Sequence, residues 1–158
     1  MPMEVKKIIV LGDSDSGKTT ALENICENLI KTTALDYGKA VIHGKKVYFF
    51  CSPGNKRFAF MQDIISKNLD GAIIFIDNTV GITKNNMELI RFIEGKRVPY
   101  VIFANKQDMN NRPLNIGVNA PIIPTSAITG QGLKNGLERL FKLMNNERMK
   151  LKQLAVTS

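Results

Sequence analysis

The sequence has few cysteines and no tryptophan. Among its 158 residues there are two cysteines, Cys26 and Cys51, which lie far apart in the chain. A chain of this length buries roughly two-thirds of its unfolded surface, so it needs neither a disulfide nor a structural metal to fold. Because Cys26 shares an apolar spacing with Leu22, Ile25 and Leu29, we expect it to be a buried free thiol on a helix.

Long hydrophobic runs are missing as well. No apolar stretch approaches the ~20 residues that a membrane-spanning helix requires. The apolar run directly before Gly12 has only four residues, which is too few for the core of a signal peptide. Residue 2 is proline, and the last four residues contain no cysteine that could be prenylated. We therefore expect a cytoplasmic protein without a transmembrane or lipid anchor.

Acidic residues are fewer than basic ones. Lysine and arginine number 22 against 14 acids, which gives a net charge of +8. Such an excess is compatible with nucleic acid, an anionic membrane or an acidic protein partner, but the bases are spread along the chain and a solvated surface explains them equally. No appended RNA-binding module is visible, so nucleic acid is not the expected partner. We expect a single domain over 1–158, with a basic C-terminal tail at about 147–158.

Apolar runs alternate with helical patterns along the chain. This alternation predicts an α/β fold with three layers, in which a mostly parallel sheet of about six strands is covered by helices on both faces. The close connection at residues 43–46 makes the second and third strands antiparallel and gives one antiparallel edge. Strands are expected at 8–11, 37–42, 47–51, 72–76, 100–104 and 122–124, and helices at 18–30, 57–67, 85–95 and from about 132.

A glycine-rich stretch separates the first predicted strand from the first predicted helix. Residues 12–19 fit the P-loop pattern of glycine, four residues, then glycine-lysine-threonine. In that pattern backbone N–H groups and a helix N-terminus face the phosphates, Lys18 supplies a positive charge and the Thr19 hydroxyl binds Mg²⁺. The alternative is a turn with an incidental lysine. The predicted nucleotide-binding residues are Gly12, Asp13, Ser14, Asp15, Ser16, Gly17, Lys18, Thr19 and Thr20.

A second polar segment ends the predicted strand at 100–104. Asp108 can accept two hydrogen bonds from the ring N–H and the amino group of guanine, whereas adenine offers no such pair of donors. Asn105 can tie loops together, and the stem of Lys106 can cover the base. Alone, the tetrapeptide at residues 105–108 could equally be a polar helix cap. After the next strand, the backbone of Ser126 and Ala127 can support the base from its other side, which favours a guanine site.

With both motifs in this order, the chain resembles a Ras-superfamily small GTPase over almost its whole length. Within that superfamily, residues 32–38 and 52–54 are most similar to the prokaryotic branch that includes the MglA-like polarity GTPases. The resemblance implies the P-loop NTPase fold, GTP or GDP as ligand and Mg²⁺ as cofactor. It also implies a first-switch threonine on Mg²⁺, which is Thr32, with Thr33 as the alternative.

The third motif of that family departs from its pattern here. Cys51 stands where the family has an aspartate, and a thiol is no ligand for Mg²⁺. Asp77 could compensate, or it could serve only in a turn. Gly54 is the position whose N–H would meet the γ-phosphate, and Asn55 replaces the water-positioning glutamine with a shorter amide. Arg57 could add positive charge to the transition state, or be an exposed residue at a helix start.

The sequence therefore predicts a GTP/GDP switch with slow, Mg²⁺-dependent GTP hydrolysis, monomeric or weakly dimeric. Lys18, Gly54 and Asn55 are the predicted catalytic residues, and Thr19 and Thr32 the predicted metal ligands. The alternative is a pseudo-GTPase that holds guanine nucleotide without significant hydrolysis. Residues 37–62, from Tyr37 to Gln62, contain no acid, so we expect this stretch to meet a protein effector or regulator, with protection of the sheet edge as the alternative.

Overall fold

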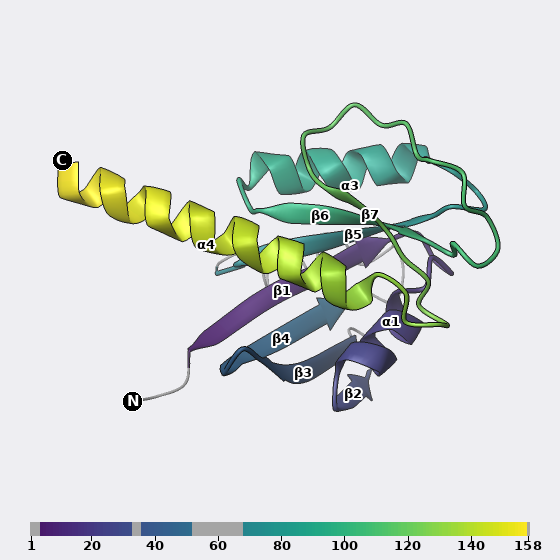
Figure 1. The fold of residues 1–158 in the computed structure, drawn as a ribbon, viewed down its shortest axis with the longest axis horizontal. Helices are drawn as coiled ribbons and strands as arrows, with labels where there is room; N and C mark the ends of the chain where they lie inside the picture. The colour runs from purple at the N-terminus through teal and green to yellow at the C-terminus, as the bar shows by residue number, and fades with distance from the viewer. Residues whose placement is uncertain (1–3, 33–35, 52–67, 158) are drawn as a thin grey trace.

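The computed structural model describes residues 4–32, 36–51 and 68–157 (Figure 1). In this part of the chain strands and helices alternate, as the sequence predicts. The elements are β1 (Val5–Gly12), α1 (Lys18–Ile25), β2 (Asn28–Lys31), β3 (Asp36–Ile42), β4 (Lys45–Cys51), β5 (Gly71–Asp77), α3 (Lys84–Gly95), β6 (Tyr100–Asn105), β7 (Ile122–Pro124) and α4 (Leu133–Thr157).

The described strands form one sheet of seven in the order β2-β3-β4-β1-β5-β6-β7. β1 lies between β4 and β5 and is parallel to both, and the parallel pairing continues through β6 to β7. On the other side, β3 is antiparallel to β4. The predicted α/β class and its mostly parallel sheet are confirmed.

The stretch after α1 differs from the prediction. The helix expected over 18–30 ends at Ile25, and residues 28–31 form β2, antiparallel to β3. Apolar spacing over so short a run fits a helix or a strand, and the open edge of β3 decides the outcome because its backbone groups need partners. Consequently β3 is an inner strand, and the edge expected at residues 37–42 is covered by β2.

Cys26 lies at the bend between α1 and β2. It is buried and free, as predicted, although it follows the helix instead of lying within it. Its side chain occupies the space above Gly38, where an added Cβ would come within 2.6 Å of the sulfur. Burial raises the pKa of the Cys26 thiol to about 11, so the thiol stays protonated at neutral pH.

Alternate residues of the buried strands face opposite sides of the sheet. One side packs on α1 and α4 through residues such as Val10 and Phe103, and the other packs on α3 through residues such as Ile9 and Ile102. Strands buried on both faces explain the continuous apolar runs in the sequence. The arrangement directs the carboxyl ends of β1, β5, β6 and β7 to one edge of the sheet.

The β3–β4 connection is tighter than predicted. Ile42 pairs with Lys45, so only His43 and Gly44 form the turn. Both have positive φ, 52° and 74°, as a two-residue hairpin turn of this hand requires. The hairpin itself, and its antiparallel sense, agree with the sequence.

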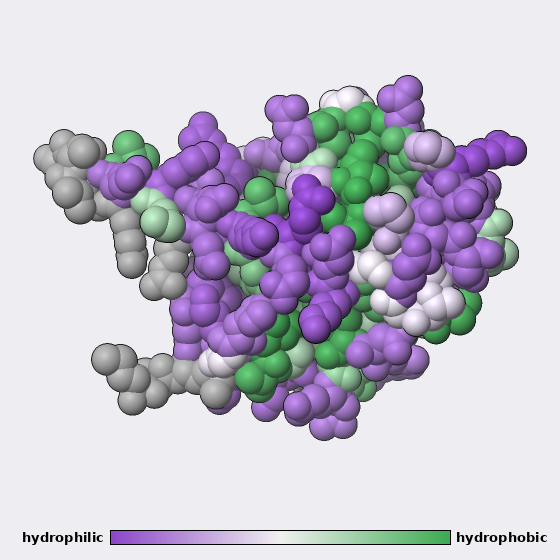
Figure 2. Space-filling view, in the orientation of Figure 1, coloured by the Kyte–Doolittle hydropathy of each residue, from purple (hydrophilic) through white to green (hydrophobic). Residues whose placement is uncertain are grey.

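Helix α4 crosses the sheet and continues past its edge (Figure 1). Its first turns are buried through Leu133, Leu137, Leu140 and Met144. The polar side chains along its outer side are visible in Figure 2. Residues 147–157, expected as a basic tail, form the last turns of this helix.

Several predictions fall on residues outside the described ranges. They are Thr33, the predicted helix at 57–67, and the part of the third motif that follows Cys51, with Gly54, Asn55 and Arg57. Within the described ranges, no helix has the length and apolar character that crossing a membrane requires.

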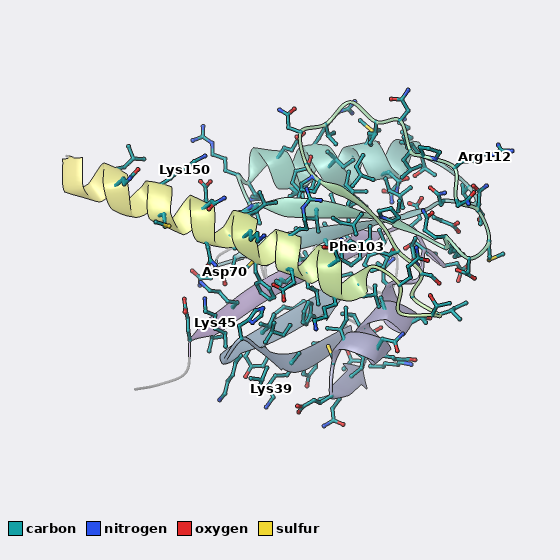
Figure 3. All side chains as sticks on the ribbon, viewed as in Figure 1. Lys39, Lys45, Asp70, Phe103, Arg112 and Lys150 are labelled. Carbon is teal, nitrogen blue, oxygen red and sulfur yellow. The ribbon has the colours of Figure 1, made fainter. Side chains whose placement is uncertain are left out.

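Gly136 allows α4 to approach β6 closely. A Cβ at this position would lie 2.3 Å from Phe103 Cε1, and Phe103 is fully buried beside α4 (Figure 3). We predict that Gly136→Val lowers the free energy of unfolding by about 1–3 kcal/mol, because the side chain overpacks a filled core. Urea denaturation measures the change.

Gly95, the last residue of α3, is the matched control. An added Cβ there meets no atom within 4 Å, so Gly95→Ala should be neutral or stabilise by up to about 1 kcal/mol. Equal urea midpoints for the Gly136 and Gly95 variants would contradict close packing of α4 on β6.

Candidate functional site

A cleft of about 500 Å³ lies at the carboxyl ends of the parallel strands. Its size and its place at this edge of an open α/β sheet are typical of a ligand site. The loop after β1 forms one wall and the loops after β6 and β7 form the other. The lining residues are Ser14, Asp15, Ser16, Gly17, Lys18, Thr19, Thr20, Asn105, Lys106, Asp108, Met109, Ala127 and Ile128.

The P-loop joins β1 to α1 as predicted. Asp15 and Gly17 have positive φ, 63° and 100°, so the chain curls before α1 begins. Gly17 precedes the helix and lies so close to Asn105 that an added Cβ would come within 2.0 Å of Asn105 Nδ2. The tight loop and the helix N-terminus together form an anion-binding cradle.

Lys18 begins α1 and its side chain is folded back into the loop. Its Nζ donates to the carbonyl oxygens of Gly12, at 2.6 Å, and Asp13, at 2.8 Å. Burial lowers the pKa of Lys18, and nearby negative groups, including Asp13 and Asp15, oppose that effect. The charge of Lys18 is thus held beside the loop carbonyls at one wall of the cleft.

Asn105 ends β6 and is buried, and it lines the cleft. Its Nδ2 donates to the carbonyl of Ser16 at 2.8 Å. Its Oδ1 accepts from the hydroxyl of Thr125 and from the N–H of Ala127, both at 3.0 Å. The predicted role of Asn105 in tying loops together is therefore what the structure shows.

Asp108 lies two residues beyond Lys106, exposed at the rim of the cleft. The hydroxyl of Ser126 donates to its Oδ1 at 2.8 Å, which fixes one carboxylate oxygen. The sequence predicts that Ser126 and Ala127 support the base through their backbone. In the structure Ser126 acts through its side chain, and the N–H of Ala127 bonds to Asn105.

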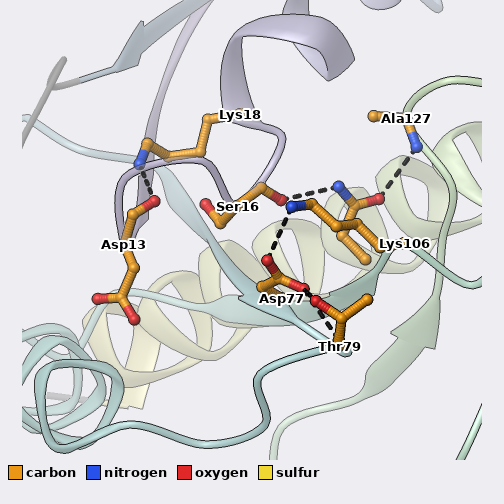
Figure 4. Close-up of polar contacts among 8 residues, drawn as sticks. Asp13, Ser16, Lys18, Asp77, Thr79, Lys106 and Ala127 are labelled. Carbon is orange, nitrogen blue, oxygen red and sulfur yellow. Dashed lines mark hydrogen bonds and ion pairs between the residues drawn. The ribbon is translucent and has the colours of Figure 1, made fainter. Parts of the chain in front are cut away.

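Lys106 and Asp77 form an ion pair across the ends of β5 and β6, with Nζ and Oδ2 2.8 Å apart (Figure 4). Asp77 Oδ1 also accepts from the N–H and hydroxyl of Thr79. Partial burial alone raises the pKa of Asp77, but the hydrogen bonds from Lys106 and Thr79 outweigh it and lower the pKa. Of the two roles considered for Asp77, the turn role is the one observed.

Asp36 lies at the site, although the sequence analysis gave it no role. It begins β3, is buried, and its Oδ2 lies 3.5 Å from Thr19 Oγ1. Its partner in the register is Cys51, the residue that replaces the expected aspartate. Asp36 thus places a carboxylate on the strand next to the position where the expected aspartate is replaced by Cys51. An acid that opens a strand with no other acidic residue was the signal that could have identified it.

Cys51 itself is buried, and burial raises the pKa of its thiol to about 12. At neutral pH it is therefore a neutral thiol, and a thiol is no ligand for Mg²⁺. Thr19 and Asp36 supply the hard oxygen atoms that Mg²⁺ prefers, so the residues present fit that ion. Thr32 follows β2 and is exposed.

Comparison with known proteins identifies a family. The profile described as "Elongation factor Tu GTP binding domain" matches residues 30–146, which is most of the chain. An uncharacterised protein of Methanocaldococcus jannaschii is 42% identical over 117 residues, covering 70% of this chain and 76% of that protein. Translation initiation factor IF-2 of Mycoplasmopsis pulmonis is 28% identical over 160 residues, covering 87% of this chain.

The chain spans only 26% of the length of that initiation factor. Among solved structures, the bacterial selenocysteine-specific elongation factor EF-Sec superposes with a TM-score of 0.74 at 17% identity, covering 91% of this chain and 29% of the other. The G domain of the T. maritima FeoB iron transporter gives 0.70 at 15% identity, covering 89% and 99%. These two likenesses show the fold.

Removing the side chain of Asn105 should loosen the whole site. We predict that Asn105→Ala lowers the free energy of unfolding by about 2–5 kcal/mol, because three buried groups, one on the P-loop and two on the loop after β7, each lose their partner. Chemical denaturation tests this, with Asn111→Ala at an exposed position as the control, expected to stay within about 0.5 kcal/mol of wild type. Equal stability of the two variants would mean that Asn105 does not join the loops.

Proposed function

The chain belongs to the family of elongation factor Tu GTP binding domains, and from this premise we propose that it binds GTP and GDP and acts as a molecular switch. The observation that carries the proposal is the single cleft lined by Lys18 and Asp108. Lys18 is suited to phosphate and Asp108 to guanine. Their joint presence on one described cleft supports a guanine nucleotide over a simple anion.

The base would lie between the loops after β6 and β7. Asp108 would accept hydrogen bonds from guanine, with the Ser126 hydroxyl holding its carboxylate in place. Adenine offers the carboxylate no matching pair of donors, which strongly disfavours its binding. The Lys106 stem, held by Asp77, would cover one face of the base.

The phosphates would lie on the P-loop. Its backbone N–H groups and the N-terminus of α1 would stabilise their negative charge. Lys18 would exchange part of its contact with the loop carbonyls for the β- and γ-phosphate oxygens. In this family Mg²⁺ accompanies the nucleotide and neutralises phosphate charge. Thr19 and Asp36 are the residues that would hold it, with Thr32 retained as a proposed third ligand.

GTP hydrolysis is proposed to be slow. Water would attack the γ-phosphate in line, with Lys18 and the loop amides stabilising the charge that develops. Gly54 would sense the γ-phosphate and Asn55 would orient the water, both outside the described residues. The amide of Asn55 is one methylene shorter than glutamine, and a misplacement of ~1 Å can cost ~100-fold in rate.

A pseudo-GTPase is the second candidate, favoured by Asn55 and by Cys51. The buried carboxylate of Asp36 weakens this alternative, because it restores an acidic group beside Thr19. Tight GTP binding without single-turnover hydrolysis would favour the pseudo-GTPase.

We further propose a cytoplasmic monomer or weak dimer of the MglA-like type that meets a protein effector through Tyr37–Gln62. Lys39 and Lys45, in the β3–β4 hairpin, belong to this surface (Figure 3). Lys45 Nζ lies 3.5 Å from Glu4 Oε2, so part of the positive charge of Lys45 is compensated within the chain. The initiation factors share about a quarter of their length with this chain, and the proposal concerns the nucleotide site alone.

Guanine specificity is the direct test. We predict by calorimetry that wild type binds GTP and GDP at least about 100-fold more tightly than ATP, because only guanine pairs with Asp108. Asp108→Asn should shift the preference toward xanthosine diphosphate, whose carbonyl replaces the amino group of guanine. Gln107→Asn, next to Asp108, is the control and should keep the guanine preference. Equal affinities of wild type for ATP and GTP would refute the assignment.

The Mg²⁺ assignment has its own test. Asp36→Asn should raise the free Mg²⁺ concentration needed to retain a fluorescent GDP analogue by about tenfold or more, since metal sites typically lose this much when a supporting carboxylate is removed. Fluorescence during titration with a chelator measures it. Asp70→Asn removes a carboxylate at the opposite end of β5, away from the cleft, and should behave like wild type. An unchanged midpoint in Asp36→Asn would remove Asp36 from the metal site.

A further inference from the structure

Asp13 belongs to the P-loop, yet its side chain is bonded to a distant helix. The first turn of α3 and the residue before it donate to the carboxylate. Thr83 Oγ1 lies 2.7 Å from Oδ2, and Asn85 Nδ2 lies 2.5 Å from Oδ1. A third donor, Asn86 Nδ2, is 3.5 Å from Oδ2. The side chain therefore serves the contact between two segments about 70 residues apart in sequence.

The backbone of the same residue holds the phosphate-binding lysine. The carbonyl oxygen of Asp13 accepts from Lys18 Nζ at 2.8 Å and from the N–H of Ser16 at 3.2 Å. A movement of Asp13 would thus move both a carbonyl that positions the lysine and the turn that presents the loop amides. The contact with α3 limits such a movement.

Helix α3 also depends on this contact. Its first turn contains no acidic residue of its own, although a negative charge there would stabilise the exposed N–H groups and the positive end of the helix dipole. The cap is neutral, made by Thr83 and Asn86, which bond to each other's backbone N–H. Asp13 supplies the missing charge from the P-loop.

We propose that Asp13 is a positioning residue that couples the P-loop to the first turn of α3, so that Asn85 and Thr83 control how fast nucleotide leaves the cleft. The proposal rests on the guanine-nucleotide function proposed above. It reassigns Asp13 from nucleotide contact, as the sequence pattern indicates, to support of the loop from behind. A partner that bound the first turn of α3 would then act on nucleotide release.

An exchange of the two interacting side chains tests the coupling. Asn85→Asp places a second carboxylate against Asp13, and we expect release of a fluorescent GDP analogue to accelerate about tenfold, because like charges replace a charge-assisted hydrogen bond. Asp13→Asn in the same protein restores a carboxylate–amide pair with reversed polarity. The double variant should return to within about threefold of the wild-type release rate.

Asn135→Asp is the matched control. Asn135 is exposed in the first turn of α4, so the same substitution adds the same charge to another helix start. It should leave GDP release unchanged. Release in Asn85→Asp within twofold of wild type would overturn the proposal, as would a double variant no slower than Asn85→Asp. A loss of thermal stability in Asn85→Asp with normal release would show a structural role only.

Hydrogen exchange of a peptide covering residues 12–19 gives a readout that needs no nucleotide. In the nucleotide-free protein, Asn85→Asp should increase exchange in this peptide, and the double variant should reverse the increase. Equal exchange in all variants would overturn the coupling. Failure of wild type to bind GDP would instead refute the proposed function, and the exchange result would still decide whether α3 holds the P-loop.

Discussion

The site depends on one buried amide. Asn105 is almost fully enclosed, and its three side-chain hydrogen bonds reach two segments, the P-loop and the loop after β7. An amide buried without partners would be costly, so both segments are held where their polar groups meet it. This one side chain therefore ties together the loops that form the two walls of the cleft.

Four aspartates in or beside the cleft make different contacts because their neighbours differ. Asp108 is exposed and steadied by a hydroxyl, which leaves it free to meet a ligand. Asp77 is paired with a lysine, and Asp13 is bonded to a helix start. Asp36 is buried beside the hydroxyl of Thr19. In the proposed function, the same carboxylate group would serve base selection, support or metal binding according to what it touches.

Asp36 and Cys51 show how a site can keep a charge while the residue that usually carries it changes. The two residues are opposite each other on antiparallel strands, and the side chains of such a pair lie on the same face of the sheet. A carboxylate moved from one strand to its neighbour therefore stays near the same hydroxyl. The family relationship is compatible with the altered motif for this reason.

The sequence by itself determined the order of the elements, the P-loop, and the polar segment that contains Asn105 and Asp108, because these depend on local periodicity and on contiguous residues. Only the tertiary structure decided that residues 28–31 form a strand, since the partner that stabilises it is β3. It also decided which groups the side chains of Asp36 and Asp13 contact. Their partners, Thr19 and Asn85, lie 17 and 72 residues away, and no local pattern encodes a contact across such a separation.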